Sequence, residues 1–214
     1  MTTKKRAIMF IDGNNWYHNV KSVVEKPRSI DFRKMADVIA KRFDLNIVDI
    51  RYYNSTPDIE FSEEVYYKHM VFLAGLKQKG LLVRTNKLKK INANGKSLRV
   101  EKGIDVMIVV DMIKKTLLEK ECECCVLISG DSDFVPAMRL VKSEGKEILT
   151  VSVLKGYARE LLQGEFRFWI MKKGDVVKAK QKIHSAIQHE EKAETAVDHS
   201  IDKLDDALNT LGIE

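Results

Sequence analysis

The sequence has few cysteines, no long apolar run and no leader-like segment. Its three cysteines, Cys122, Cys124 and Cys125, lie within four residues of one another. They are too close together to build a disulfide framework, and they are one ligand short of a four-ligand zinc site. This pattern excludes a disulfide-stabilised secreted domain and predicts a reducing, intracellular setting.

Apolar runs are short throughout the chain. The N-terminus offers only residues 7–11 as an apolar run, whereas a signal peptide needs roughly 7 to 15 apolar residues in its core. No stretch approaches the roughly 20 apolar residues of a membrane-spanning helix. We therefore expect a soluble, cytoplasmic protein with no membrane partner.

Several common catalytic motifs are also absent. The sequence has no Walker A loop, no GxGxxG after a strand, no GxSxG elbow and no HExxH pair. A phosphatase of the DxDxT type would need a second aspartate where Asn14 stands. These absences set aside P-loop, dinucleotide, serine-hydrolase, zinc-protease and aspartyl-phosphate chemistry.

The charge that is present is unevenly distributed. The 214 residues carry a formal net charge of +6, but residues 171–214 hold seven lysines against nine acids, which leaves +8 on residues 1–170. A basic compact body favours attraction to nucleic acid. The acidic tail places Val197, Ile201, Leu204, Leu208 and Leu211 at steps of four and three, the pattern of an amphipathic helix. We expect this helical tail to pack on the body or to support a homodimer.

The body alternates strand-like and helix-like segments. Short β-rich runs predict strands at residues 7–11, 47–53, 81–85, 126–129 and 148–153, and apolar spacing predicts helices at residues 31–43, 60–79, 104–118 and 134–143. The helix over 104–118 is apolar almost all round, which predicts burial on every side. Such alternation indicates a three-layer α/β/α fold around a mainly parallel sheet. The lysine-rich segment 86–102 predicts an exposed hairpin that turns at Asn94 and Gly95.

Two predicted strands run directly into aspartates. Residues 7–11 lead into Asp12, Asn14 and Asn15, and residues 126–129 lead into Asp131 and Asp133. In an open parallel sheet, ligands bind outside the carboxyl ends of the strands, where the strand order reverses. Each motif alone is equally consistent with a simple turn or helix cap, but the pair favours a site.

A third carboxylate, Asp105, lies near the start of the apolar helix. A carboxylate among apolar neighbours is costly unless it caps the first turn or has a partner, so both interpretations stay open. Asp111 lies six residues further on, roughly 240° around the helix, and cannot point to the same place. We therefore interpret Asp111 as structural.

Four converging carboxylates would require a cation. Two such charges about 5 Å apart repel by roughly 3 kcal/mol at an effective dielectric of about 20. Oxygen ligands without histidine or cysteine favour Mg²⁺ or Mn²⁺, which bind substrate phosphates. If Asp12, Asp105, Asp131 and Asp133 meet, phosphodiester hydrolysis is the natural chemistry.

A basic segment precedes Asp105. Residues 84–102 carry seven lysines or arginines against one acid, and Lys87, Lys89, Lys90 and Lys102 could follow a phosphate backbone. A solvated lysine-rich loop explains the same pattern. Trp16, Tyr17, Tyr52 and Tyr53 could stack bases, but aromatics beside strands more often belong to a core. His18 is not required as a proton shuttle.

Four motifs in this order resemble the NYN domain, in the LabA-like branch of the PIN-like nucleases. They are IDGNN, YKHMVFLAGLKQKGLLVRTNKLK, EKGIDVMIVVDM and SGDSDFVPAMRLVKSEGKEI, and the resemblance covers roughly residues 5 to 170. It implies parallel strands in the order 3-2-1-4-5 and Mg²⁺- or Mn²⁺-dependent cleavage of RNA. The family's acidic positions fall on Asp12, Asp105, Asp131 and Asp133, with Asn15 as its DGxN asparagine. We therefore expect a nuclease domain over residues 1–170 and a tail over residues 171–214 that is too short for an added RNA-binding domain.

The leading hypothesis is a metal-dependent endoribonuclease acting on single-stranded or loosely structured RNA. Asp12, Asp105 and Asp131 would hold metal, Asp133 would complete the site, and Asn15 would orient Asp12 or a phosphate. Asn14 and Lys102 would contact substrate. The alternatives are a non-catalytic or weakly active RNA-binding regulatory module with the same acidic pocket, and a DNA-directed or structure-specific nuclease.

Overall fold

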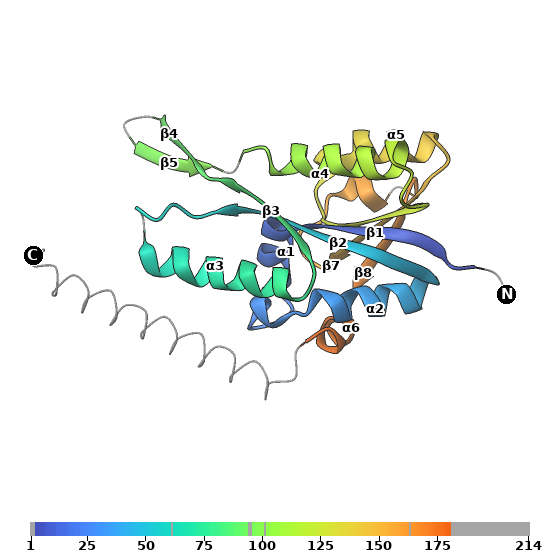
Figure 1. Ribbon diagram of the computed structural model, residues 1–214, viewed down its shortest axis with the longest axis horizontal. Helices are drawn as coiled ribbons and strands as arrows, with labels where there is room; N and C mark the ends of the chain where they lie inside the picture. The colour runs from blue at the N-terminus through green and yellow to red at the C-terminus, as the bar shows by residue number, and fades with distance from the viewer. Residues whose placement is uncertain (1–2, 61, 94–95, 101, 163, 181–214) are drawn as a thin grey trace, which may run out of the picture. The chain divides into compact units, whose positions relative to one another are not determined.

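The computed structural model describes residues 3–60, 62–93, 96–100, 102–162 and 164–180, with side chains left undescribed at residues 89–93 and 96–100 (Figure 1). A six-stranded, all-parallel sheet forms its centre, in the order β3-β2-β1-β6-β7-β8. The strands are β1 (Lys5–Asp12), β2 (Leu45–Thr56), β3 (Leu82–Lys87), β6 (Cys124–Ile128), β7 (Glu147–Val153) and β8 (Arg167–Met171). The predicted order is confirmed, and β8 adds a sixth strand that the sequence did not reveal.

Helices cover both faces of the sheet (Figure 1). One face packs on α1 (Gly13–Val20), α2 (Phe32–Phe43), α3 (Glu63–Gln78) and α6 (Lys173–Lys178). The other face packs on α4 (Ile104–Ile113) and α5 (Val135–Ser143). Four short helical segments lie between these elements: η1 (Pro27–Ser29), the π-helical η2 (Lys114–Leu118), η3 (Ser132–Phe134) and η4 (Arg159–Leu162). The predicted three-layer α/β/α architecture is therefore confirmed.

The helix ends follow the polar residues of the sequence. Asp31 caps α2 by accepting hydrogen bonds from the backbone of Arg33 and Lys34, and Ser62 caps α3 through the backbone N–H of Val65. Such caps satisfy N–H groups that have no partner within the helix. The helices predicted at 31–43 and 60–79 therefore begin within three residues of the expected positions.

One expectation about α4 is wrong. Ile104, Ile108 and Met112 are fully buried at steps of four, but Val106 and Val110 are more than half exposed. The helix packs on the sheet along a single stripe, so its uniform apolar composition does not correspond to burial on every side.

The predicted hairpin is present. Strands β4 (Lys89–Ala93) and β5 (Lys96–Val100) pair antiparallel, from Lys89 with Val100 to Ala93 with Lys96. The expected turn residues Asn94 and Gly95 lie outside the described residues, as does the tail from residue 181 onward. Whether the tail is helical, and whether the domain boundary falls at residue 170, therefore stay predictions.

Candidate functional site

The predicted site residues at the ends of β1 and β6 lie where the strand order of the sheet reverses. Chain connectivity runs from β1 to β2 on one side and reaches β6 on the other, so the β1–β6 boundary is the switch point. Ile11 of β1 pairs with Ile128 of β6, which places Asp12 beside the segment that begins with Ser129. In open parallel sheets this edge forms the ligand crevice.

Asp12 is buried and held from two sides. One carboxylate oxygen accepts a hydrogen bond from the backbone N–H of Asn15 (3.0 Å) and so caps α1. The other accepts from the hydroxyl of Ser129 (3.2 Å), across the β1–β6 boundary. Gly13 allows the tight exit from β1, because a Cβ there would lie 2.4 Å from the Tyr52 ring. Asp12 is thus a helix cap whose carboxylate has a fixed orientation.

The side chain of Asn15 joins α1 to the segment after β6. Its amide oxygen accepts hydrogen bonds from the backbone N–H of Gly130 (3.0 Å) and from the side chain of Asn19 (2.8 Å). Asn19 also donates to the carbonyl of Gly156 (2.9 Å), in the loop after β7. This oxygen therefore holds α1 against the segment after β6, and a contact between the Asn15 amide group and substrate stays a prediction. Asn14, in the same turn, is half-buried.

The turn after β6, which carries Asp131 and Asp133, is ordered by hydrogen bonds between residues of that same turn. The backbone N–H of Asp131 donates to the Ser129 hydroxyl (3.2 Å), and Asp131 in turn accepts from the backbone N–H of Asp133 (3.0 Å), capping η3. Gly130 is required here, since a Cβ would lie 1.9 Å from the Gly156 carbonyl. The loop after β7 therefore closes directly over this turn.

Asp105 approaches the same edge from α4. It is half-buried in the first turn, whose preceding residue Gly103 supplies no side-chain cap. Burial raises the pKa of Asp105, and the negative charges of Asp131 and Asp133 raise it further. The charges of Asp131 and Asp133 therefore act on Asp105 in the structure, whereas the expectation that these carboxylates bind a cation stays a prediction.

The donor chemistry at this edge suits a hard divalent cation. In the described part of the chain, no lysine or arginine forms an ion pair with Asp105, Asp131 or Asp133, and the described residues therefore leave their mutual repulsion in place. Carboxylate oxygens are the ligands that Mg²⁺ and Mn²⁺ prefer. Among the same residues, no three His, Cys, Asp or Glu side chains stand close enough together to enclose one ion. The carboxylates are thus neighbours without forming a closed cage.

The predicted substrate lysines lie around the hairpin. Lys87 ends β3 and Lys102 precedes α4, and both side chains are exposed. Asn86 donates to the Lys102 carbonyl (2.7 Å), which closes the base of the hairpin. Lys89 and Lys90 pair through their backbones with Val100 and Arg99, and the structure describes only the backbone at these two positions. Their contact with substrate stays a prediction.

Asp111 is structural, as the sequence predicted. Its carboxylate accepts a hydrogen bond from the Tyr53 hydroxyl (2.7 Å) and forms ion pairs with Arg84 and, at 3.4 Å, with Arg51. Arg51 is also paired with Asp49 at 2.7 Å. This network ties α4 to β2 and β3 just before the hairpin begins.

Sequence reasoning assigned no role to Ser129, Asn19 or Gly156. Asn19 lies four residues after Asn15, and this helical spacing was a usable signal, as was Ser129 at the end of a predicted strand. Gly156 reaches the site only through the tertiary fold. Trp16, Tyr52 and Tyr53 belong to the core, and the three cysteines are free and buried, as expected for packing residues.

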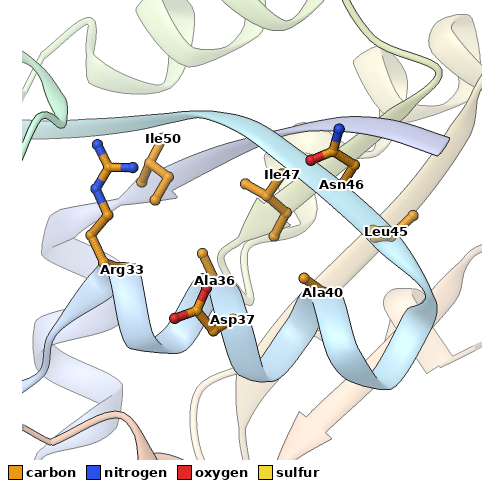
Figure 2. Close-up of a pocket in the computed structure, with 8 residues that line it drawn as sticks. All are labelled: Arg33, Ala36, Asp37, Ala40, Leu45, Asn46, Ile47 and Ile50. Carbon is orange, nitrogen blue, oxygen red and sulfur yellow. The ribbon is translucent and has the colours of Figure 1, made fainter. Parts of the chain in front are cut away.

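The cavity drawn in Figure 2 is a separate feature. It has a volume of about 160 Å³ and lies between α2 and the first half of β2, lined by residues such as Arg33, Asp37 and Ile47. The β2 residues that line the cavity lie at positions 45–50, before Tyr53. Tyr53 is the residue that pairs with Asp12. The cavity therefore opens near the amino ends of the strands, away from the carboxylates.

A parallel α/β/α sandwich with carboxylates at its switch point has the arrangement of a PIN-like nuclease. Residues 6–170 match the NYN domain, a PIN-like nuclease family, and the chain belongs to this family. It is 28% identical over 165 residues to the low amplitude and bright protein LabA of Synechococcus elongatus, covering 76% of this chain and 82% of LabA.

Structural similarity agrees with this fold. A crystal structure of a protein of unknown function from Vibrio parahaemolyticus superposes with a TM-score of 0.57 at 16% identity, covering 82% of this chain and 98% of the other. Of the helices that the structure describes, none is long and apolar enough to cross a membrane.

Proposed function

We propose that this NYN protein is a metal-dependent endoribonuclease that hydrolyses phosphodiester bonds of single-stranded or loosely structured RNA. One observation supports the proposal: within a nuclease family fold, the charges of Asp131 and Asp133 at the switch-point edge raise the pKa of Asp105, and among the described residues no lysine or arginine is paired with these three carboxylates. Such repulsion is costly in a folded protein and is relieved when a cation binds.

The residues have distinct roles in this proposal. Asp12, Asp105 and Asp131 would hold Mg²⁺ or Mn²⁺, and Asp133 would complete the negative edge. The ion, when bound, supplies a Lewis acid for the phosphoryl group. Asn15 and Ser129 keep Asp12 and Asp131 in position through the hydrogen bonds described above. The exposed Lys102, with the hairpin lysines, would attract the RNA backbone.

Cleavage of labelled RNA with Mn²⁺, with and without chelator, tests the proposal. The decisive variant is Asp131→Asn, because an amide oxygen can still accept the hydrogen bond from Asp133 that caps η3. We expect cleavage to fall by at least about 100-fold, since a catalytic ion contributes several kcal/mol to the transition state. Asp37→Asn, an exposed site on α2, is the matched control and should retain full activity.

Three results would contradict the proposal. Equal cleavage by Asp131→Asn and the unaltered protein would remove Asp131 from the mechanism. A rise in melting temperature with Mn²⁺, together with RNA binding but no cleavage, would instead support a regulatory RNA-binding module. Side-by-side RNA, single-stranded DNA and flap substrates would identify a DNA-directed nuclease by preferential cleavage of DNA.

A further inference from the structure

Helix α1 presents three different faces. Trp16 and Val20 are buried in the core, and Asn15 and Asn19 bind the segments after β6 and β7. The remaining face is directed away from both contacts. It carries, in sequence order, Asn14, Tyr17, His18 and Lys21, of which His18 and Lys21 are exposed. This face starts at the acidic edge, because Asp12 caps the helix.

The Tyr17 ring holds two cations near it. The Lys21 ammonium nitrogen lies 4.2 Å from the ring centroid, and the Arg28 guanidinium carbon lies 6.0 Å from it. The same guanidinium is 5.8 Å from the ring of Phe72 on α3. Aromatic faces attract cations through their quadrupoles, so Tyr17 holds Lys21 beside α1, and Arg28 lies near rings of both α1 and α3.

Both cations at this place lack a carboxylate partner among the described residues. Within those ranges, neither Lys21 nor Arg28 forms an ion pair, although both lie against an aromatic ring. Burial lowers the pKa of His69, and the charge of Arg28 lowers it further. Among the residues that the structure describes, the buried Nε2 atom of His69 also finds no hydrogen-bond partner. An anionic group would balance this charge.

We infer that Tyr17, Lys21 and Arg28 form a phosphate-binding subsite for the RNA strand, distinct from the lysine-rich hairpin. The inference rests on the proposed function, because it concerns how the same substrate reaches the same acidic edge. Lys21 follows Asp12 by nine residues, or about 13 Å along a helix that rises about 1.5 Å per residue. The subsite therefore contacts a backbone phosphate beyond the one that is cleaved.

The test measures binding of a fluorescent, unstructured oligouridylate in chelator, so that binding is separated from cleavage. The Lys21→Ala/Arg28→Ala double variant is compared with Lys41→Ala/Arg6→Ala. The control pair removes one exposed lysine and one exposed arginine near the starts of β2 and β1, at the opposite edge of the sheet. Both variants lose the same charge, and both melting temperatures are measured to confirm folding.

Counterion release sets the expected effect. Each phosphate contact with a single strand contributes about 0.7 to the slope of log K against log salt, so the loss of two contacts lowers the slope by about 1.4. If the two proteins bind equally at about 1 M salt, a slope difference of about 1.4 makes the double variant bind roughly 25-fold more weakly at about 0.1 M. The control pair should change the slope by much less.

The Tyr17 ring provides a second, independent comparison. Tyr17→Phe keeps the aromatic face and should bind like the unaltered protein. Tyr17→Leu releases the two cations and should bind about two- to fivefold more weakly, the range expected for an exposed cation–π contact. Equal weakening by the two double variants, or an unchanged slope for Lys21→Ala/Arg28→Ala, would overturn the subsite.

Failure of the subsite is distinguishable from failure of the proposed function. If the unaltered protein cleaves the RNA and the two double variants bind it equally well, the nuclease proposal stands and the subsite is wrong. If the unaltered protein neither binds nor cleaves RNA, the proposed function itself fails, and the subsite fails with it.

Discussion

Asp111 offers the sharpest test of how the fold supports the site. Its carboxylate is 4% exposed and holds Tyr53, Arg51 and Arg84 at the point where β2, β3 and α4 meet. We consider Asp111→Ala, which removes every one of these contacts, and Asp111→Asn, which keeps an acceptor for the Tyr53 hydroxyl but removes the charge. The two variants separate hydrogen bonding from ion pairing.

The expected loss in free energy of unfolding depends on which contacts Arg51, Arg84 and Tyr53 keep after Asp111 is replaced. Removing one member of a fully buried ion pair costs about 3–5 kcal/mol, because the other charge is left uncompensated. Here Arg84 is nearly half exposed and can be solvated, and Arg51 keeps Asp49 at 2.7 Å, so the electrostatic cost falls to about 2 kcal/mol. The orphaned Tyr53 hydroxyl adds about 1 kcal/mol in the alanine variant. We expect losses of about 3 kcal/mol for Asp111→Ala and about 2 kcal/mol for Asp111→Asn.

Thermal and urea denaturation measure these losses. At about 2–4 °C per kcal/mol for a domain of this size, Asp111→Ala should melt about 6–12 °C lower. Asp37→Asn, which removes an exposed charge from α2, should melt within about 2 °C of the unaltered protein. Equal melting temperatures for Asp111→Ala and Asp37→Asn would refute the reasoning.

The same network predicts a dependence on pH. Burial alone would raise the pKa of Asp111, but hydrogen bonds from Arg84 and Tyr53 and the charges of both arginines outweigh it and lower that pKa. A lowered folded-state pKa stabilises the protein above the unfolded value, near pH 4, and this contribution is lost as the pH falls through the folded value. The unaltered protein should therefore lose more stability on acidification below about pH 4 than Asp111→Asn does.

Two further predictions concern the acidic edge. Burial and two neighbouring charges raise the pKa of Asp105, so its ionised form destabilises the fold. Asp105→Asn should therefore stabilise the metal-free protein at neutral pH by about 1 kcal/mol. Urea titration in chelator measures this change, and a loss of stability would contradict the prediction. Gly130→Ala should cost about 1–3 kcal/mol, because its Cβ would meet the Gly156 carbonyl at 1.9 Å; a melting temperature equal to that of Gly75→Ala, which meets nothing, would contradict it.

Much of the fold could be predicted because its signals are local. The strands before Asp12 and Ser129 are short, continuous apolar runs, as buried parallel strands must be, and each ends at the first polar residue. Parallel pairing then brings both ends to one edge of the sheet. The convergence of the strand-end aspartates therefore follows from topology and needs no knowledge of side-chain packing.

The contacts that could not be predicted are long-range. Asn15 and Gly130 are 115 residues apart, and Asn19 and Gly156 are 137 apart, so no local pattern links them. Strand β8 was missed because a five-residue run with one arginine and one tryptophan gives little periodicity. The exposed face of α4 was missed because apolar composition does not reveal which side of a helix meets the sheet.

The capping and catalytic interpretations of the strand-end aspartates are compatible. Asp12 and Asp131 each use one oxygen to accept a backbone N–H, and this contact fixes the direction of the carboxylate. Asp105 has no such hydrogen bond in the described part of the chain, and its ionised form is opposed by burial and by its neighbours. Hydrogen bonds thus fix the direction of the Asp12 and Asp131 carboxylates. The Asp105 carboxylate has no such bond within the described residues, and its neighbours repel its charge. Under the proposed function, cation binding would act most strongly on Asp105, because that carboxylate gains the largest relief of repulsion.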